Sequence, residues 1–376
     1  MHSQPIHVMH VMGGMTGGGI ESVVLNYCRH MDPRRVVFDF LVHDHSPVLP
    51  VRDMTIHGGR IFTVPSYDRY PVQYLRECER IFRREHPDIV HAHMNAWNVL
   101  SLGMAHVAGV PIRVAHSHTT SNATGSARSM IKSLITKPWS RSHATHYAAC
   151  TAQAASWLFG AHHLSQVFLM RNAVEPGRFA FDAHARKTVR RELGLTDGQL
   201  HIGHVGRFSY PKNHPFILDV FADLLRCRPD AHLTLVGEQN DVDVPALIRE
   251  RNLERHVTVV GFRNDVSAYY SAFDALLFPS HYEGFGMVGV EAQANGLPVL
   301  MSSNISMDAD LVPGLVKHLP LEADVTLWSQ TLEKLAYDHV GNRDDAAYAA
   351  TVAERGYGIQ ANAESLMQWY ESLLVT

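Results

Sequence analysis

Two glutamates eight residues apart are the residues of this chain best suited to chemistry. Glu283 and Glu291 belong to the stretch Phe278-Pro-Ser-His-Tyr-Glu-Gly-Phe-Gly-Met-Val-Gly-Val-Glu. The apolar run 275–278 is short enough for a buried strand, and the pattern after Gly286 is helical. We therefore expect Glu283 in a strand-to-helix loop whose glycines let the backbone approach a ligand closely. The N–H groups that begin such a helix suit a phosphate or another oxyanion.

The spacing of the two carboxylates argues against glycoside hydrolysis. Eight residues along one helix separate Glu283 from Glu291 by about 12 Å, whereas the paired carboxylates of glycosidases stand roughly 5 to 9.5 Å apart. One carboxylate in a loop and one on the following helix are better placed to hold two parts of one ligand. The structural alternative is that Glu283 only offsets the dipole of the helix.

Two cations follow another apolar segment. The sequence His201-Ile-Gly-His-Val-Gly-Arg-Phe-Ser-Tyr-Pro-Lys-Asn213 predicts a strand, a glycine and a turn flanked by Arg207 and Lys212. A guanidinium binds phosphate oxygens in pairs, and an ammonium adds a mobile point charge. Together they could clamp a diphosphate and stabilise the negative charge of a leaving nucleotide. The alternative is a solvated loop without a ligand.

A glycine-rich loop follows the first apolar segment. Residues 6–11 precede Gly13-Gly-Met-Thr-Gly-Gly-Gly-Ile-Glu21, after which the pattern becomes helical. A strand, a glycine loop and a helix predict a phosphate cradle, although a plain tight turn is also possible. As a dinucleotide fingerprint the loop is imperfect, and Asp39 lies inside a predicted strand rather than at its end. An NAD-dependent dehydrogenase therefore stays an alternative.

The sequence contains 26 histidines, several of them in His-x-His pairs at 43/45, 91/93 and 116/118. Imidazole is a common zinc ligand. We reason that the two members of a pair point to opposite faces of a strand, so that they do not chelate one ion, and we expect incidental histidines. The triplets Asp241-Val-Asp243 and Asp308-Ala-Asp310 do not follow a strand as a metal-holding triplet would, so we expect no metal site.

Glu283 and Glu291 resemble the two-glutamate motif of the retaining nucleotide-sugar glycosyltransferases of family 4, and the resemblance extends over nearly the whole chain. It implies the α/β fold named GT-B, in which two Rossmann-like domains with parallel sheets face each other across a cleft. We expect an acceptor domain at 1–172 and a donor domain at 173–355, with a linker at about 172–198. Residues 356–376 would form a helix that crosses back to the first domain.

The resemblance implies a role for each charged candidate. Glu291 would hold ribose hydroxyls, and Glu283 would meet the donor sugar. Arg207 and Lys212 would hold the diphosphate. The family commonly has glycine after the lysine, where this chain has Asn213.

The resemblance also implies contacts from other segments. His118, at the exit of the predicted strand 112–118, would contact the donor sugar, with His116 as the reserve candidate. The remaining residues expected near the donor are Gly17, Gly18, Gly19, Phe262, Arg263, Phe285, Gly286, Met287 and Val288.

Composition and charge indicate the class of protein, its location in the cell and the kind of partner it binds. The chain is 46% hydrophobic and 19% charged, as in soluble globular proteins, and its four cysteines form no Cys-x-x-Cys pair. Without a basic leader or an apolar run of about 18 residues, we expect a cytoplasmic protein, possibly at the inner face of the membrane. The net charge is +6 over residues 1–180 and −10 over 181–376. This asymmetry indicates a phosphate-bearing or membrane-surface partner rather than a nucleic acid.

The sequence thus predicts a hexosyltransferase that needs no cofactor or metal. It would move a sugar from a nucleotide diphosphate sugar, with UDP favoured, to a hydroxyl of a saccharide or lipid-linked saccharide, most like bacterial capsule or exopolysaccharide enzymes. An epimerase or a sugar phosphorylase of the same fold, and a non-catalytic sugar-nucleotide binder, are alternatives. Residues 126–141 predict a basic, partly amphipathic helix that either seats the enzyme on an anionic membrane or packs into its own domain.

Overall fold

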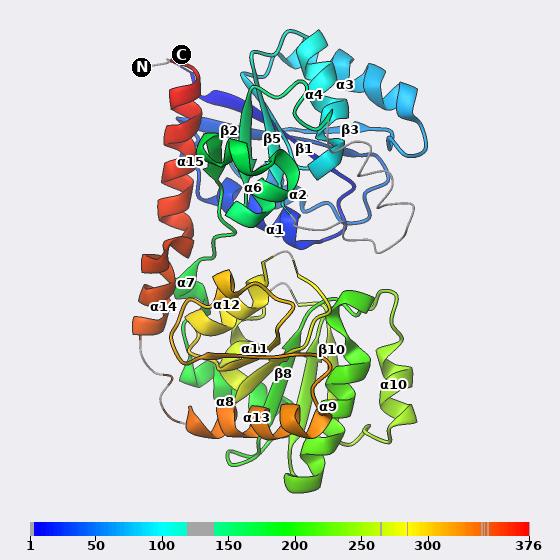
Figure 1. Cartoon of the computed structure of the whole chain (residues 1–376), viewed down its shortest axis with the longest axis vertical. Coiled ribbons are helices and arrows are strands. Elements are labelled where there is room, and N and C mark those ends of the chain that lie inside the picture. The colour runs from blue at the N-terminus through cyan, green and yellow to red at the C-terminus, as the bar shows by residue number, and fades with distance from the viewer. Residues whose placement is uncertain are drawn as a thin grey trace. The chain divides into compact units, whose positions relative to one another are not determined.

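The computed structural model describes residues 4–118, 139–263, 265–283, 285–339, 341, 343 and 346–375. The chain forms two compact units, one from Met1–Ala173 with Ile359–Thr376 and the other from Val174–Gly358. Each unit alternates strands with helices around a parallel sheet (Figure 1). The predicted α/β class is therefore confirmed.

The first unit contains a seven-stranded sheet in the order β3-β2-β1-β4-β5-β6-β7, counted over the described residues. Its strands are β1 (Ile6–Gly13), β2 (Val36–His43), β3 (Ile61–Val64), β4 (Ile89–Ala92), β5 (Ile112–Ser117), β6 (His146–Ala149) and β7 (Val167–Leu169). Its helices are α1 (Gly19–Arg29), α2 (Val51–Met54), α3 (Pro71–Glu85), α4 (Asn98–Val107), α6 (Ala152–Phe159), α15 (Ile359–Leu373) and the 3₁₀ turns η1 (Asn95–Trp97) and η3 (Ala161–Gln166).

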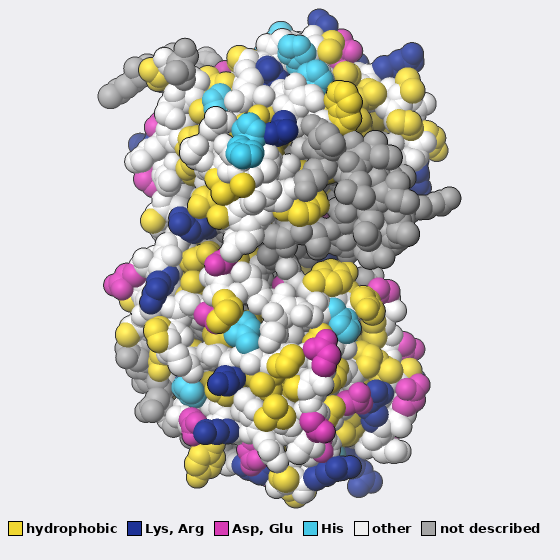
Figure 2. Space-filling view, in the orientation of Figure 1, with side chains coloured by type: hydrophobic (Ala, Val, Ile, Leu, Met, Phe, Trp, Pro, Cys, Tyr) yellow, Lys and Arg dark blue, Asp and Glu magenta, His cyan; other side chains and the backbone are white. Residues whose placement is uncertain are grey.

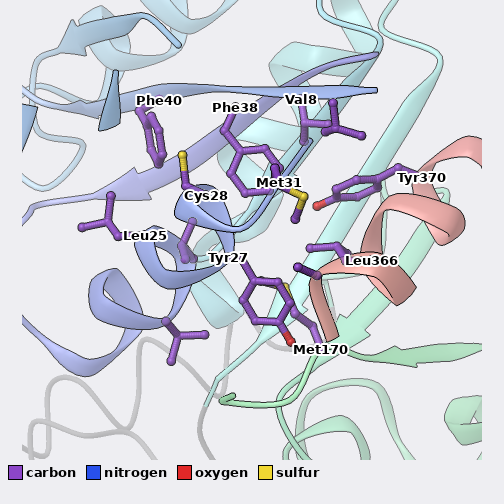
Figure 3. Packing of buried hydrophobic residues seen from close by; sticks show 14 of the residues in the cluster. Val8, Leu25, Tyr27, Cys28, Met31, Phe38, Phe40, Met170, Leu366 and Tyr370 are labelled. Atoms are coloured by element: carbon purple, nitrogen blue, oxygen red, sulfur yellow. The ribbon is translucent and has the colours of Figure 1, made fainter. Parts of the chain in front are cut away.

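Helix α15 completes one face of this sheet, although it comes from the far end of the chain. Its residues Leu366 and Tyr370 are fully buried, in one core with Val8 of β1 and Phe38 of β2 (Figure 3). The opposite face is covered by α3, α4 and α6, whose buried side chains form a second core. Strands that are covered on both faces are expected to be almost continuously apolar. These strands are largely buried but also carry polar side chains, His10, His91 and His116 among them.

The second unit contains a six-stranded sheet in the order β10-β9-β8-β11-β12-β13, again over the described residues. Its strands are β8 (His201–Val205), β9 (His232–Val236), β10 (Val257–Gly261), β11 (Ala275–Phe278), β12 (Val299–Ser302) and β13 (Val316–Leu319). Its helices are α7 (Pro176–Phe179), α8 (Ala183–Glu192), α9 (His214–Cys227), α10 (Val244–Glu250), α11 (Ser267–Ala272), α12 (Met287–Ala294), α13 (Val325–Asp338) and α14 (Ala347–Val352), with short turns η4 (Tyr210–Lys212), η5 (Met307–Ala309) and η6 (Ala353–Tyr357). Helices α7 and α8 lie within the segment 172–198 that the sequence suggested as a linker.

The strand order reverses beside β1 in the first unit and beside β8 in the second. In open parallel sheets, ligands bind at the carboxyl ends of the strands where the order reverses. The loops at these two places follow β1 and β4, and β8 and β11. They contain the glycine loop, the two cations and Glu283, which the sequence also singled out, and His93, which it did not.

Among the described residues on the face shown in Figure 2, Lys and Arg lie singly or in small groups between other side chains and form no broad patch. None of the helices in the described ranges has both the length and the apolarity that crossing a bilayer demands. The predicted helix at 126–141 lies outside the described residues apart from its last three. Of these, Trp139 is 63% exposed.

Candidate active site

The loops after β8 and β11 bring two predicted site residues into direct contact. Nζ of Lys212 lies 2.7 Å from Oε1 of Glu283, and the two side chains are only 16% and 15% exposed. The ammonium also lies 4.8 Å from the centroid of the Phe278 ring. The cation expected on the diphosphate and the carboxylate expected on the sugar are thus a single ion pair.

Local backbone geometry explains how Lys212 reaches this place. A Cβ on Gly206 would lie 2.9 Å from Cε of Lys212, so a larger residue at 206 would displace the lysine side chain from its present path across the strand exit. Asn213 has φ +57°, a left-handed conformation that asparagine tolerates better than most residues. This conformation accounts for asparagine where the family commonly has glycine. Its Nδ2 also donates to the carbonyl of Pro279 at 3.2 Å, which ties the two loops together.

Glu291 lies on α12 and accepts a hydrogen bond from the hydroxyl of Tyr270 on α11, at 2.7 Å. Burial raises the pKa of Glu291 to about 7, and it outweighs the Tyr270 hydrogen bond and the positive charges of Arg178 and Lys212, which lower the pKa. Near neutral pH the protonated and the ionised forms of this carboxyl are therefore both populated. Only the ionised state can accept hydrogen bonds from ribose hydroxyls with both oxygens.

The backbone turns tightly at the start of α12, as the glycines of this stretch predict. Gly286 has φ +83°, and a Cβ there would lie 3.0 Å from Cγ2 of Ile305. Met287 and Val288 form the first turn, whose N–H groups have no partner within the helix. Phe285 is buried and stacks on Tyr357 with ring centroids 5.0 Å apart, so its side chain anchors the loop in the core. Gly284 lies outside the described residues.

The other donor-domain candidates lie at strand exits. Arg207 is exposed directly after β8. Phe262 follows β10 and is 61% exposed, which leaves its ring available to stack on a base. Arg263 donates to the Phe262 carbonyl at 2.9 Å and to the hydroxyl of Tyr269 at 3.2 Å. The Phe262 carbonyl is therefore already occupied by Arg263, and a nucleobase that donated to this carbonyl would share it with the guanidinium.

The glycine loop of the first unit already holds a carboxylate. Gly17 has φ +76°, Gly18 caps α1, and Gly19 is its first residue. Glu21 accepts hydrogen bonds from the backbone N–H of Thr16 at 2.9 Å and of Gly18 at 2.5 Å. A phosphate in this loop would compete with Glu21 for those donors, so the predicted cradle stays a prediction.

His118 lies directly after β5 and is almost fully buried. Its backbone N–H donates to Oδ1 of Asn95 at 2.8 Å, and its Nε2 lies 2.8 Å from Nδ1 of His93. Its ring is stacked on that of His116, the reserve candidate, with centroids 3.9 Å apart. Burial lowers the pKa of His118 to about 3, so the ring is neutral at neutral pH.

The expectation that His-x-His pairs point to opposite faces of a strand is wrong. Residues two apart share a face, because only adjacent residues alternate. His91 and His93 therefore lie beside His116 and His118, and His10 pairs in register with His91. Two groups, His10/His91/His93 and His93/His116/His118, each have ring nitrogens within 4.8 Å of one another. The correct period of two predicts that the members of each pair share a face, and the register of the neighbouring strands then brings the pairs together.

The acidic residues considered for metal or NAD have other partners. Asp243 caps α10 by accepting from the N–H of Ala246 at 3.0 Å. Asp310 lies 2.9 Å from Nε2 of His318. Asp39 is buried within β2 and forms an ion pair with Arg60 at 2.6 Å, so it does not stand at a strand end where a ribose would lie.

Comparison with known proteins now bears on the family. Residues 17–178 match the model described as Glycosyltransferase Family 4, and residues 185–318 match the model described as Glycosyl transferases group 1. The chain is 33% identical over 378 residues to a Bacillus subtilis (strain 168) protein named "Putative glycosyltransferase EpsF", a match that covers 98% of this chain and 97% of that protein. The chain belongs to the family 4 glycosyltransferases.

Solved structures show that this family 4 enzyme has the GT-B fold. Anabaena Alr3699/HepE, solved in complex with UDP, superposes with a TM-score of 0.79 at 16% identity, over 98% of this chain and 100% of that one. WaaG, described as a glycosyltransferase involved in lipopolysaccharide biosynthesis, superposes with a TM-score of 0.72 at 16% identity, over 97% and 99% of the two chains. The predicted fold and glycosyl transfer are confirmed.

In each unit of this glycosyltransferase, some residues beside the candidates were not predicted. Tyr270 contacts Glu291, and Phe278 lies under Lys212. His10 and His93 belong to the histidine cluster of the first unit. Tyr270 and Phe278 read as ordinary core residues in the sequence, and only the spatial arrangement identifies them.

Proposed function

We propose that this enzyme moves a sugar from a UDP-sugar to a hydroxyl acceptor, with retention of the anomeric configuration and without a metal. The observation that carries the proposal is the contact of Lys212 with Glu283 where the strand order reverses, with Arg207 exposed after the neighbouring β8. A diphosphate between Arg207 and Lys212 would release Glu283 for the hydroxyls of the sugar. The complex of Anabaena Alr3699/HepE with UDP-glucose supports UDP as the nucleotide.

The proposed chemistry uses this chain's own charges. The bond between the anomeric carbon and the diphosphate oxygen breaks, and Arg207 and Lys212 stabilise the negative charge that develops on the departing oxygen. The acceptor hydroxyl forms its bond to the same face of the anomeric carbon, and its proton passes to the departing phosphate oxygen. Two fixed cations supply the positive charge that a divalent metal would otherwise provide. Glu291 holds the ribose.

A transfer assay tests the reaction. Purified enzyme with UDP-glucose and a saccharide acceptor should yield a product whose anomeric configuration, read by NMR, equals that of the donor. Turnover should persist in excess EDTA. An inverted product would contradict retention, and loss of turnover in EDTA restored by magnesium would contradict metal independence. An epimerase would convert donor without acceptor, and a phosphorylase would require inorganic phosphate.

The base of the nucleotide is tested separately. A bound nucleotide stabilises the folded enzyme by RT ln(1 + [L]/Kd), about 2.7 kcal/mol at a hundredfold excess over Kd. In a thermal-shift series of nucleoside diphosphates, UDP should raise Tm more than GDP or ADP. A larger shift with GDP or ADP would assign a different donor.

The proposed acceptor is a lipid-linked saccharide of capsule or exopolysaccharide synthesis, met at a membrane surface. The structural likeness to WaaG, which its description links to lipopolysaccharide, supports this class. Trp139, at the end of the basic segment 126–141, is exposed and suits an interface. Vesicles containing anionic lipid should carry the enzyme in flotation, less so at high salt. The triple alanine variant of Arg128, Lys132 and Lys137 should not float with the vesicles. Flotation of this variant equal to that of the unmodified enzyme would refute the surface contact.

A further inference from the structure

Three histidines of the first unit form one hydrogen-bonded chain. Nδ1 of His10, on β1, lies 2.8 Å from Nε2 of His93. Nδ1 of His93, after β4, lies 2.8 Å from Nε2 of His118, after β5. Both ring nitrogens of His93 are thus occupied by other rings. This hydrogen-bonded chain runs along one face of the sheet from a fully buried end at His10 to His118, which the family resemblance implies as a contact of the donor sugar.

A second hydrogen-bonded chain of side chains lies beside the first and ends at a different histidine. The hydroxyl of Tyr370, which projects from α15 into the core (Figure 3), lies 2.6 Å from Nδ1 of His91. Nε2 of His91 lies 3.0 Å from Nδ1 of His116. This chain terminates at His116. His91 is therefore a buried histidine of the same sheet face that pairs with His10 in register without belonging to the chain of His118.

Neutral rings in a chain cannot choose their tautomers independently. Burial lowers the pKa of His10 and of His118 to about 3 and keeps the pKa of His93 well below its usual value. A neutral imidazole has one nitrogen that donates and one that accepts. Once the protonated nitrogen of one ring is fixed, the hydrogen bonds fix the protonated nitrogen of the other two rings. The three rings together therefore have two possible arrangements.

The buried end selects between the two arrangements. Nε2 of His10 is buried and has no hydrogen-bond partner among the described residues. A buried N–H without an acceptor is rarer in proteins than an acceptor that lacks a donor. His10 therefore keeps its proton on Nδ1 and donates to His93, and His93 in turn donates to His118. The proton of His118 is left on Nδ1.

We propose that His10 and His93 are positioning residues that hold His118 in its Nδ1–H tautomer. His118 then offers a hydrogen-bond donor, which suits a sugar or phosphate oxygen that accepts. The consequence for transfer rests on the proposed contact of His118 with the donor, whereas the tautomer itself does not. His10 acts on the ligand only through two other rings.

The same nitrogens suggest a transition-metal site, but two observations oppose it. The rings are paired through hydrogen bonds at 2.8 Å, and a metal would have to replace the proton between two of them. Neither histidine group includes a carboxylate, although a buried divalent ion is costly without nearby negative charge. The hydrogen-bonded chain uses the observed geometry without either change.

Long-range ¹⁵N–¹H correlation spectra test the tautomer directly, because they distinguish protonated from unprotonated ring nitrogens. In the unmodified enzyme treated with chelator, His118 should carry its proton on Nδ1. His10→Phe removes the end of the chain and should give His118 a mixture of tautomers. His10→Asn retains an amide near the position of Nδ1 and should restore the single tautomer. His91→Phe, matched in burial and sheet face, should leave it unchanged.

Kinetics then test the positioning role. His10→Phe should lower kcat/KM about threefold to tenfold, the scale of one hydrogen bond, and His10→Asn should recover most of it. A proton on Nε2 of His118 in the unmodified enzyme, or an unchanged tautomer in His10→Phe, would overturn the proposal. A changed tautomer with unchanged kcat/KM would overturn the positioning role. An unaltered kcat/KM in His118→Ala would instead refute the proposed sugar contact. Binding of Co²⁺ with a visible absorption band that His93→Phe abolishes would replace the chain with a metal site.

Discussion

The places where the strand order reverses hold polar clusters of opposite character in the two units. In the first unit, buried neutral rings bond to one another between the sheet and α15. In the second, an ion pair of Lys212 with Glu283 lies in loops and remains about 15% exposed. Full burial favours neutral groups with fixed partners, because an unpaired charge there is too costly. Partial exposure lets charges exchange partners when a ligand arrives. The first cluster is suited to orienting a group, and the second to receiving one.

The largest loss of activity should come from removing a cation of the second cluster, Arg207 or Lys212. Arg207→Ala and Lys212→Ala should each reduce kcat/KM by roughly 2 to 4 kcal/mol in barrier terms, the scale of a lost oxyanion donor. The measurement is initial-rate kinetics with intact folding checked by circular dichroism. Arg226→Ala is the matched control, because Arg226 is 81% exposed in the same unit and forms its ion pair with Asp223 of its own helix. If both site variants turn over like the control, the diphosphate clamp is refuted.

The next effect concerns the protonation of Glu291. With a pKa of about 7 and a ligand that needs the carboxylate, UDP binding should release a proton and weaken as the pH falls. Between pH 8 and pH 6 the ionised fraction, and with it the affinity, should fall roughly tenfold. Calorimetry at several pH values measures this change.

Glu291→Gln provides the control for that pH dependence. It should bind UDP about 1.5 to 3 kcal/mol more weakly and should retain only the pH dependence that UDP itself contributes through its phosphate. If the variant and the unmodified enzyme show the same pH profile, the carboxylate does not hold the ribose in the way proposed.

The sequence predicted the second cluster better than the first, for a physical reason. Glu283 and Lys212 follow strands within recognisable glycine-containing loops, and Glu291 lies on the helix that follows one of these loops. Local rules on turns and helix starts apply to all three. The histidine cluster depends on the register between β1, β4 and β5, which no local pattern specifies. An error about which residues of a strand share a face then made the pairs 91/93 and 116/118 look incidental, although both belong to the cluster.

The buried contacts of the donor unit were equally hidden from the sequence. The hydrogen bond of Tyr270 to Glu291 joins two helices, and the raised pKa of Glu291 depends on burial that only the packed structure reveals. The position of Asn213, by contrast, was noted as a departure from the family, and its left-handed backbone shows why the departure is tolerated. Local conformation can be argued from one residue, whereas burial requires the whole fold.

A smaller effect tests the neutral character of the histidine cluster through stability. Because the pKa of His10 in the folded state is about 3, below the usual 6.5, the unfolded chain binds a proton that the folded chain excludes. Stability is therefore full above about pH 6.5 and is lost as the pH falls towards 3. Between pH 7 and pH 5.5 each such ring should cost about 1 kcal/mol of the free energy of unfolding. Denaturant unfolding of His10→Phe should show a correspondingly shallower loss over this range, and a loss as steep as in the unmodified enzyme would indicate that His10 is already charged.

The smallest effect distinguishes an ion pair that exchanges partners from one that is permanent. Glu283→Gln removes the counter-charge of Lys212 while keeping the size of the side chain, so Lys212 is free to meet a phosphate. A partly exposed, solvent-screened ion pair stabilises by up to about 1 kcal/mol. Because a phosphate no longer has to replace this pair in the variant, the affinity for bare UDP should rise by up to roughly fivefold. Affinity for the intact UDP-sugar should fall, because the sugar loses its carboxylate. Calorimetry with both ligands measures the two changes. If Glu283→Gln weakens UDP and UDP-sugar equally, the carboxylate helps to build the nucleotide site itself, and the division of roles between Glu283 and Glu291 fails.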